Sequence, residues 1–273
     1  MTELVLSLFP GIGLLDRAFS SAGFVVVQGP DLITGGDVRE FAGVPGRFDG
    51  IVAGPPCQGF SVANSFRTDG DHKSVVNSRR MLQETCRIIL ECAPTWWLIE
   101  NVPGVPDVRI AGYDVQRIPI TDHECGGVQL RWRNVQFGSL DGSIIRPQRV
   151  NDCTRNRKKG RPPKAVTTKT ERWKDYPDVC RRQGLAKPID LPGWCRTAKV
   201  RAVGNGVPLR IGRVIAAAIL CRAPRDPAAD CQCGCGRSVS PRALTATASC
   251  RKRKQLSSSD PRPWVDVEGY HGD

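Results

Sequence analysis

The sequence has no long hydrophobic run and no leader-like beginning. No stretch reaches the roughly 18 consecutive apolar residues that a membrane-spanning helix needs. The N-terminus lacks a charged segment followed by an apolar run and a cleavage site, so we expect a cytoplasmic protein that is neither exported nor membrane-bound. We also find no internal repeat, which argues against a repeat architecture.

The sequence also lacks the short length and the leader that are typical of small secreted disulfide-rich proteins. Twelve cysteines would suggest disulfides in a short exported chain, but this chain has 273 residues. In a long chain without a leader, cysteines more often pack, act in catalysis or bind metal, which fits a reducing compartment. Because 40% of the residues are hydrophobic, the chain can bury a substantial core.

Positive charge is concentrated in one segment. Residues 131–201 contain 19 Lys and Arg against 6 Asp and Glu, whereas the other 21 basic and 21 acidic residues cancel. Clustered positive charge raises the affinity for polyanions through phosphate contacts and counterion release. Nucleic acid is therefore the leading partner, and a solvated basic surface is the alternative.

Hydrophobic patterning predicts alternating strands and helices in the first hundred residues. Apolar runs typical of strands are separated by segments with helical spacing. This alternation predicts an α/β fold with a mostly parallel sheet, helices on both faces and ligands at the carboxyl ends of the strands. We expect strands over 4–9, 24–28, 48–53 and 95–100, and helices ending at Gly23 and spanning about 78–92.

One cysteine follows a predicted strand on a stiff turn. In the stretch IVAGPPCQGFS, residues 51–61, Pro55 and Pro56 fix φ and offer no backbone N–H group. The backbone therefore limits where the thiol of Cys57 can lie, as suits a nucleophile that must meet one substrate atom. A packed structural thiol is the alternative.

A glycine-rich turn and two acidic residues favour a cofactor site. The turn FPGIG, residues 9–13, joins a predicted strand to a helix, where glycines let a ligand approach the backbone. Asp31, after the second strand, stands where an acid can bind both hydroxyls of a ribose, and Asp37 can accept from an adenine amino group. Each acid taken alone is better explained as a turn residue.

Four motifs in one order produce a specific resemblance. The segments GPPCQGFS (54–61), ENVPG (100–104), QLRWR (129–133) and VGNGVP (203–208) resemble, in order and near spacing, motifs of the DNA (cytosine-5) methyltransferases. The segments LFPGIG and GDV resemble the first and third motifs of that family, so the similarity spans residues 4 to about 220. Members of the family methylate C5 of a cytosine flipped out of duplex DNA, with S-adenosylmethionine as methyl donor.

The resemblance implies a Rossmann-like S-adenosylmethionine-dependent methyltransferase domain and roles for particular residues. Cys57 would add to C6 of the cytosine, and Glu100 would hydrogen-bond to ring N3. The family pattern places the target nucleotide against Arg131 and Arg133. It implies cofactor contacts from Phe9, Gly11, Gly13, Asp31, Asp37, Val38, Pro55, Asn205 and Val207, and DNA contacts from Gln58, Ser61 and Arg67.

The chain also departs from the family pattern. Ser7 stands where the family usually has an acid, and the motif that usually precedes the last one is reduced here to residues 178–194. The polar segment 61–80 after Cys57 is expected to be a lid that closes on DNA. The recognition segment is short for the family, so it does not indicate the length of the methylated site.

The expected organisation has five parts. They are a catalytic and cofactor-binding α/β domain over 1–133, a small basic target-recognition insertion over 134–195, a return segment over 196–221, a Cys-rich basic tail over 222–256 and a disordered end over 257–273. In the tail, Cys231, Cys233, Cys235 and Cys250 suit a tetrahedral zinc site. Their irregular spacing is equally compatible with free thiols in a disordered tail, and the basic residues 251–254 would assist DNA binding.

The sequence therefore predicts a site-specific DNA (cytosine-5-)-methyltransferase. We expect it to transfer the methyl group of S-adenosylmethionine to cytosine through a covalent Cys57 adduct, and to bind double-stranded DNA as a monomer. We expect it to function in restriction–modification or in a phage, in the cytoplasm of a bacterial cell. One alternative is a cytosine-5 methyltransferase acting on RNA such as tRNA, because the catalytic motifs hardly differ. The other is a catalytically silent DNA-binding protein.

Overall fold

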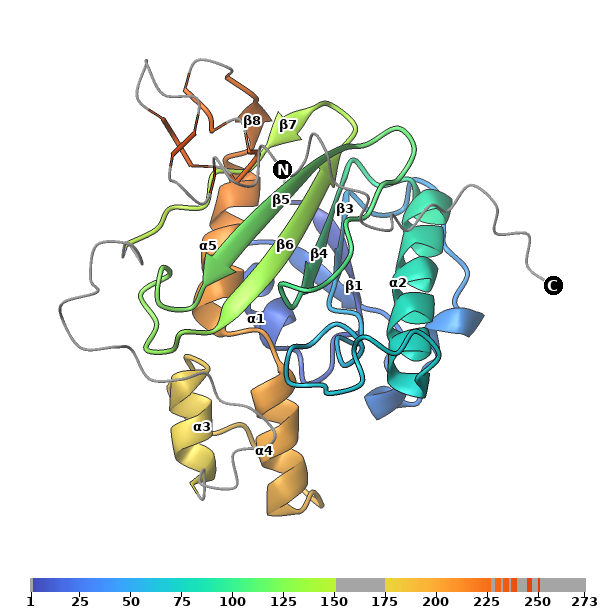
Figure 1. Ribbon diagram of the computed structural model, residues 1–273, viewed down its shortest axis with the longest axis vertical. Coiled ribbons are helices and arrows are strands. Elements are labelled where there is room, and N and C mark those ends of the chain that lie inside the picture. The colour runs from blue at the N-terminus through green and yellow to red at the C-terminus, as the bar shows by residue number, and fades with distance from the viewer. Residues whose placement is uncertain are drawn as a thin grey trace.

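Six strands form one mixed sheet in the order β2-β1-β3-β4-β6-β5 (Figure 1). The computed structural model describes residues 2–150, 175–226, 229–231, 233–235, 237–239, 245–246 and 250. The sheet is built from β1 (Leu4–Leu8), β2 (Val25–Gln28), β3 (Gly50–Ala53), β4 (Trp96–Asn101), β5 (Asp114–Thr121) and β6 (Trp132–Ser139).

The first four strands are parallel and carry the expected apolar runs. β1 pairs with β2 and β3, and β3 pairs with β4, all in parallel. Every residue of β3 and β4 is buried, because helices cover both faces of the sheet there. The expected α/β fold with a mostly parallel sheet is confirmed.

Helices lie on both faces of the sheet (Figure 1). On one face, α1 (Leu14–Ser21) and α5 (Leu209–Leu220) pack in a cluster that contains Trp96 and Phe137. On the other face, α2 (Lys73–Cys92) packs in a cluster that contains Leu6 and Trp97. These two apolar layers fix the strand ends whose loops carry the site.

The antiparallel pair at one edge changes the expected domain boundary. β6 lies between β4 and β5 and is antiparallel to both. The basic insertion was expected to begin at 134, but residues 134–139 complete β6 and are buried in the sheet. The boundary is therefore wrong at this end, since periodicity along a strand buried on both faces does not show an alternating pattern.

Two further helices lie beside the end of the sheet (Figure 1). Helices α3 (Tyr176–Arg182) and α4 (Arg196–Asn205) share an apolar cluster with Leu14 and Ala18 of α1. Helix α3 lies in the expected recognition region, and α4 begins the expected return segment. The basic stretch 154–164, residues 251–254 and residues 257–273 lie outside the described residues.

Helix α2 begins earlier than the periodicity predicted. It starts at Lys73 rather than near 78, and His72 accepts a hydrogen bond from the backbone of Ser74 at the helix start. The expected polar lid over 61–80 is therefore shortened, because its last eight residues are helical. Histidine is not among the preferred helix caps, so the sequence contained little signal for this boundary.

The segment Arg196–Leu220 is apolar and long enough to cross a membrane by length and composition alone. Within the described residues it consists of α4 and α5, separated around Pro208, and 61% of its most apolar stretch is buried inside the protein. Core packing of α5 accounts for this apolar character.

We expect Gly138→Ala to destabilise the fold by about 1–3 kcal/mol through overpacking. A Cβ at Gly138 would lie 2.2 Å from Cε2 of the buried Trp97 ring. Gly70→Ala is the matched control, because a Cβ there would approach only Nη1 of Arg79, at 3.9 Å. Urea unfolding checks both variants, and equal midpoints would contradict the packing of β6 against β4.

Candidate active site

The carboxyl ends of the parallel strands open into a cavity of about 1230 Å³. Phe9 follows β1, Asp31 follows β2, Cys57 follows β3 and Glu100 lies near the end of β4, and all four line this cavity. Ligands of open α/β sheets collect at this edge, because the loops there leave a crevice. The expected placement after strands is confirmed for Asp31 and Cys57, whereas Glu100 lies within β4.

The turn after β1 exposes its backbone to the cavity. Phe9 has φ 56° and Gly11 has φ 57°, a left-handed conformation that is uncommon for a residue with a side chain such as Phe9. No described atom lies within 4 Å of where a Cβ of Gly11 would be, so a ligand can approach this backbone. The carboxylate of Asp31 accepts from the Gly11 amide at 2.8 Å and ties the turns after β1 and β2 together.

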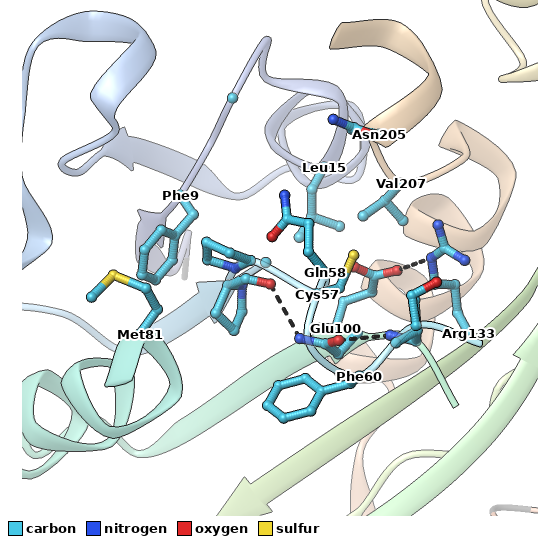
Figure 2. Close-up of a pocket in the computed structure, with 18 of the residues that line it drawn as sticks. Phe9, Leu15, Cys57, Gln58, Phe60, Met81, Glu100, Arg133, Asn205 and Val207 are labelled. Atoms are coloured by element: carbon cyan, nitrogen blue, oxygen red, sulfur yellow. Dashed lines mark hydrogen bonds and ion pairs between the residues drawn. The ribbon is translucent and has the colours of Figure 1, made fainter. Parts of the chain in front are cut away.

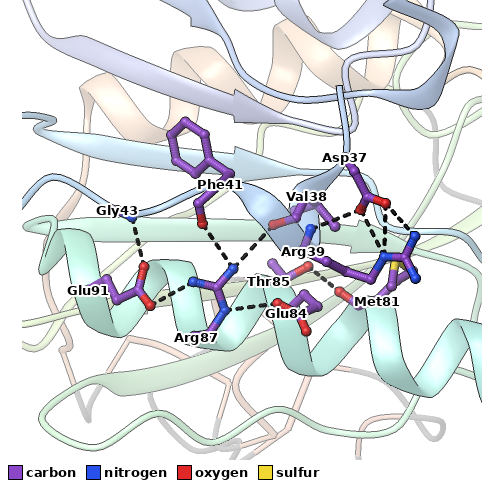
Figure 3. Close-up of polar contacts among 10 residues, drawn as sticks. All are labelled: Asp37, Val38, Arg39, Phe41, Gly43, Met81, Glu84, Thr85, Arg87 and Glu91. Atoms are coloured by element: carbon purple, nitrogen blue, oxygen red, sulfur yellow. Dashed lines mark hydrogen bonds and ion pairs between the residues drawn. The ribbon is translucent and has the colours of Figure 1, made fainter. Parts of the chain in front are cut away.

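Asp37 is held as a carboxylate at the cavity edge by its neighbour Arg39 (Figure 3). The Nε atom of Arg39 donates to both carboxylate oxygens, at 3.0 and 2.9 Å. These hydrogen bonds lower the pKa of Asp37 to about 2. The group is therefore ionised at neutral pH and is available as an acceptor.

A partly buried polar network anchors the loop that carries Asp37 (Figure 3). Arg87 of α2 donates to the carbonyls of Val38 and Phe41, at 3.2 and 3.0 Å. Glu84 and Glu91 of the same helix pair with the Arg87 guanidinium at 2.8 and 2.6 Å. The loop thus takes its position from α2, which sequence motifs did not reveal.

The turn of Cys57 is fixed from two sides. Asn101 of β4 donates to the carbonyl of Pro55 at 3.1 Å, and the amide of Gly59 donates to the hydroxyl of Ser78 on α2 at 2.9 Å. Pro55 and Pro56 limit the backbone, but these contacts decide where Cys57 lies relative to β4 and α2. Sequence reasoning missed both partners, although Asn101 stands inside the quoted ENVPG motif.

Cys57 lies beside a buried ion pair (Figure 2). Nε of Arg133 is 2.5 Å from Oε1 of Glu100, and both side chains are about nine-tenths buried, with exposures of 11% and 10%. The sulfur of Cys57 in the loop after β3, the carboxylate of Glu100 on β4 and the guanidinium of Arg133 on β6 thus lie together in the cavity. Asn205 and Val207 face the same space from the turn before α5 (Figure 2).

Arg131 ties β6 to that turn. Its Nη2 atom donates to the carbonyls of Gly204 and Gly206, at 2.7 and 3.3 Å. A nearby glutamine reinforces the link, because Gln183 donates to the carbonyls of Val203 and Gly206, at 2.8 and 3.1 Å. The turn that carries Asn205 and Val207 is therefore braced by residues far away in the sequence.

Gln129, the first residue of the QLRWR motif, contacts the end of α3 next to Gln183. Its side chain donates to the carbonyl of Arg182 at 2.7 Å, at the end of α3. The motif thus joins the end of the β5–β6 hairpin to both α3 and the turn before α5. Nothing in the sequence marked Gln183 as the partner on the α3 side.

The profile of the C-5 cytosine-specific DNA methylase family matches residues 4–185. The chain belongs to this family. Among curated relatives, it is 32% identical over 122 residues to the type II methyltransferase M.FnuDI of Fusobacterium nucleatum, covering 38% of this chain and 34% of that protein. It is 29% identical over 180 residues to M.AgeI of Thalassovita gelatinovora, covering 52% and 41%. The chain therefore spans half or less of the length of these curated relatives.

Solved structures share the fold of this family member. The methyltransferase EhMeth of Entamoeba histolytica superposes with a TM-score of 0.58 at 12% identity, over 81% of this chain and 98% of that one. A DNMT2 variant of Spodoptera frugiperda superposes with a TM-score of 0.55 at 13% identity, over 80% and 100%. At these identities the similarity concerns the fold alone.

Most residues that the family resemblance implied line the cavity of this methylase-family chain. The exceptions are Gly13, which packs toward Gln28 behind the turn, and Arg67, which is exposed in the loop before α2. The others form the cavity wall: Phe9, Gly11, Asp31, Asp37, Val38, Pro55, Cys57, Gln58, Ser61, Glu100, Arg131, Arg133, Asn205 and Val207.

The departure from the family at Ser7 has a local structural counterpart. The hydroxyl of Ser7 donates to Oδ1 of Asp16 at 2.6 Å, and Gln28 donates to Oδ2 at 2.8 Å. Ser7 borders the cavity, and Asp16 on α1 is buried behind it. The carboxylate of Asp16 thus contacts Ser7, which occupies the position where the family usually has an acid.

Burial raises the pKa of the Cys57 thiol. Removal of the thiolate from water is the largest cause, and the carboxylate of Glu100 acts in the same direction, whereas Arg133 and Arg131 oppose both. At neutral pH the thiol of the unliganded protein is therefore protonated. Reaction as a nucleophile requires loss of this proton when a substrate enters.

Two single substitutions should move the reactivity of Cys57 in opposite directions. Glu100→Gln removes a negative charge, which lowers the Cys57 pKa and speeds alkylation, whereas Arg133→Gln raises the pKa and slows it. Iodoacetamide rates for each cysteine, from peptide mass mapping at fixed pH, check this, with the exposed Cys221 as the internal reference.

The pH dependence in the wild type provides a second check. The Cys57 rate should climb about tenfold per pH unit up to and beyond about pH 8.5, the ordinary value of a free thiol. A plateau below about pH 8, or equal rates in the two variants, would contradict the electrostatics described for this site.

Proposed function

We propose that the chain transfers a methyl group from S-adenosylmethionine to C5 of a cytosine in double-stranded DNA. The observation that carries the proposal is the convergence of Cys57, Glu100 and Arg133 in one cavity, next to the turn that exposes the backbone of Gly11. Membership of the C-5 cytosine-specific DNA methylase family supports it.

The geometry suits nucleophilic catalysis on a pyrimidine. Cytosine C5 is a poor nucleophile, and addition of the Cys57 thiolate to C6 makes the ring enamine-like, so that C5 can attack a methyl group. Glu100 in its carboxylic acid form donates its proton to ring N3 as negative charge develops there, and Arg133 pairs with the carboxylate that remains. Removal of the C5 proton then eliminates the thiolate and frees the methylated base.

The residues around the turn after β1 fit an adenosine-containing cofactor. Asp31 follows β2 and Asp37 lies beyond it, and both line the cavity, as expected for contacts to ribose hydroxyls and an adenine amino group. Phe9 presents an aromatic ring, and Val38 and Pro55 contribute apolar surface. When bound here, S-adenosylmethionine supplies the methyl group.

Double-stranded DNA is the partner that the charge distribution favours. The net positive charge lies in residues 131–201, a segment that begins with the two arginines of the site, Arg131 and Arg133. The cytosine has to leave the duplex to reach Cys57 inside the cavity. Gln58 and Ser61 line the cavity and Arg67 is exposed in the same loop, so this loop can contact the DNA strand. We place the protein in the bacterial or phage-infected cytoplasm, as a monomer on DNA.

A biological role in restriction–modification follows from the relatives, whose names are those of type II methyltransferases. An RNA substrate is the second candidate, because the same motif residues can methylate cytosine in either nucleic acid. A silent DNA-binding protein is disfavoured, because it has no need for a thiol, a carboxylate and a guanidinium in one cavity.

A covalent trap tests the proposal. The purified chain is incubated with labelled S-adenosylmethionine and duplex DNA containing 5-fluorocytosine, since fluorine at C5 blocks elimination of the enzyme. We expect a denaturation-resistant complex with the wild type and with Cys221→Ala, and none with Cys57→Ala, whose methyl transfer to ordinary DNA should fall by more than about 10³-fold.

The same assay with tRNA separates the candidates. Methyl transfer to tRNA without transfer to DNA would move the assignment to RNA. Activity of Cys57→Ala equal to the wild type would refute the mechanism, and absence of transfer to either nucleic acid would favour the silent DNA-binding protein.

A further inference from the structure

Four cysteine side chains converge in the C-terminal module, defined here as the described residues between Ala223 and Cys250. The sulfur atoms of Cys231, Cys233, Cys235 and Cys250 all lie within 4.8 Å of one another. The Cys231–Cys233 and Cys235–Cys250 sulfur distances are 3.4 and 3.7 Å, and all four cysteines are free of disulfides. In the described part of the chain this is the one group of metal-ligand type that meets at a point.

The sulfur distances suit a single tetrahedral ion. Four thiolates at about 2.3 Å from one zinc ion are about 3.8 Å from each other, close to the Cys231–Cys233 and Cys235–Cys250 sulfur distances. A disulfide needs about 2.05 Å between sulfur atoms. Three of the four cysteines are almost fully buried, with exposures of 1% for Cys231 and 0% for Cys235 and Cys250.

Apolar packing does not explain why these thiols are gathered. The cluster consists of the four cysteines with only Val239 and Ala246 as further apolar members among the described residues. A core of this size cannot offset the loss of chain entropy, so small modules of this kind depend on metals or disulfides. Because these four thiols form no disulfide, a metal ion is the usual source of stability for a small module of this kind.

The backbone around the cysteines forms a tight turn, and one backbone amide donates a hydrogen bond to a cysteine sulfur. The amide of Gly234 donates to the carbonyl of Cys231 at 2.9 Å, and Gly234 has φ 74°, which favours glycine. The amide of Ala246 donates to the Cys231 sulfur at 3.3 Å. Backbone amides directed at sulfur stabilise metal-bound thiolates and orient them.

Arginine side chains hold this module on the catalytic domain. Arg146 makes a two-pronged contact with Asp230, at 2.7 and 2.6 Å, and Arg237 donates to the buried Glu124 in the loop after β5 at 2.7 Å. Arg149 donates to the Cys235 carbonyl at 3.4 Å. Four thiolates around one Zn²⁺ carry a net negative charge, and Arg149, next to Cys235, lies where it offsets part of that charge.

We propose that Cys231, Cys233, Cys235 and Cys250 bind one Zn²⁺ ion, and that this ion fixes the C-terminal module against the β5–β6 hairpin. Cys233 also borders the cavity that contains Cys57, so the ion orders one wall of the candidate active site. The choice of zinc follows from the ligand set, because four sulfur atoms around one tetrahedral ion exclude the hard cations. The proposal does not depend on methyl transfer.

Metal analysis of the full chain, purified without chelators, tests the proposal. We expect about one zinc per chain in the wild type and in the control Cys221→Ser, whose exposed thiol lies outside the cluster. The double variant Cys233→Ser/Cys235→Ser should lose the zinc. A strong chelator should lower the Tm of the wild type and leave that of the double variant unchanged, because only the wild type has an ion to lose.

Cobalt substitution keeps the test decisive if the double variant does not fold. Replacing the metal of the wild type with Co²⁺ should produce the intense visible absorption of a tetrahedral tetrathiolate site. Wild-type protein that contains no zinc and takes up neither Zn²⁺ nor Co²⁺ would overturn the proposal, as would one bound iron in place of zinc. Because these readouts are metal content and spectra, they are independent of whether the chain methylates DNA.

Discussion

The insertion of β6 between β4 and β5 is the constraint on which the candidate active site depends. Its antiparallel register pairs Glu100 with Val135 and Asn101 with Asn134. Arg133 therefore arrives next to Glu100, and the Glu100–Arg133 ion pair forms at the end of β4. An ion pair this buried contributes little net stability, because desolvation offsets its attraction. Its value lies in holding a carboxylate and a cation at fixed positions beside Cys57.

The β5–β6 hairpin is also the point of attachment for two other parts of the chain. At the end near the cavity, Gln129 and Arg131 hold α3 and the turn before α5 through backbone carbonyls. At Glu124 in the hairpin loop, Arg237 connects the hairpin to the C-terminal module. Both contacts pair cationic or amide donors with buried acceptors, which makes them specific in geometry. A disturbance of the hairpin would therefore reach both of these parts of the chain, which are distant from it in sequence.

Cys57 is kept in a resting state by competing electrostatic effects. Burial and Glu100 favour the neutral thiol, while Arg133 and Arg131 favour the thiolate. A protonated thiol in an enclosed site is protected from oxidation and from unintended alkylation, since the thiolate is the reactive form.

The sequence by itself determined the α/β class, the parallel strands and the motif residues after their ends, because apolar runs, prolines and glycines act over a few residues. The tertiary structure decided that residues 134–139 belong to the sheet, that α2 begins at Lys73, and that Asn101, Ser78 and Gln183 brace the motif loops. It also decided that four irregularly spaced cysteines meet at one point. These features arise from contacts between segments far apart in the chain, and local pattern does not encode which distant partner satisfies a buried polar group or completes a ligand set.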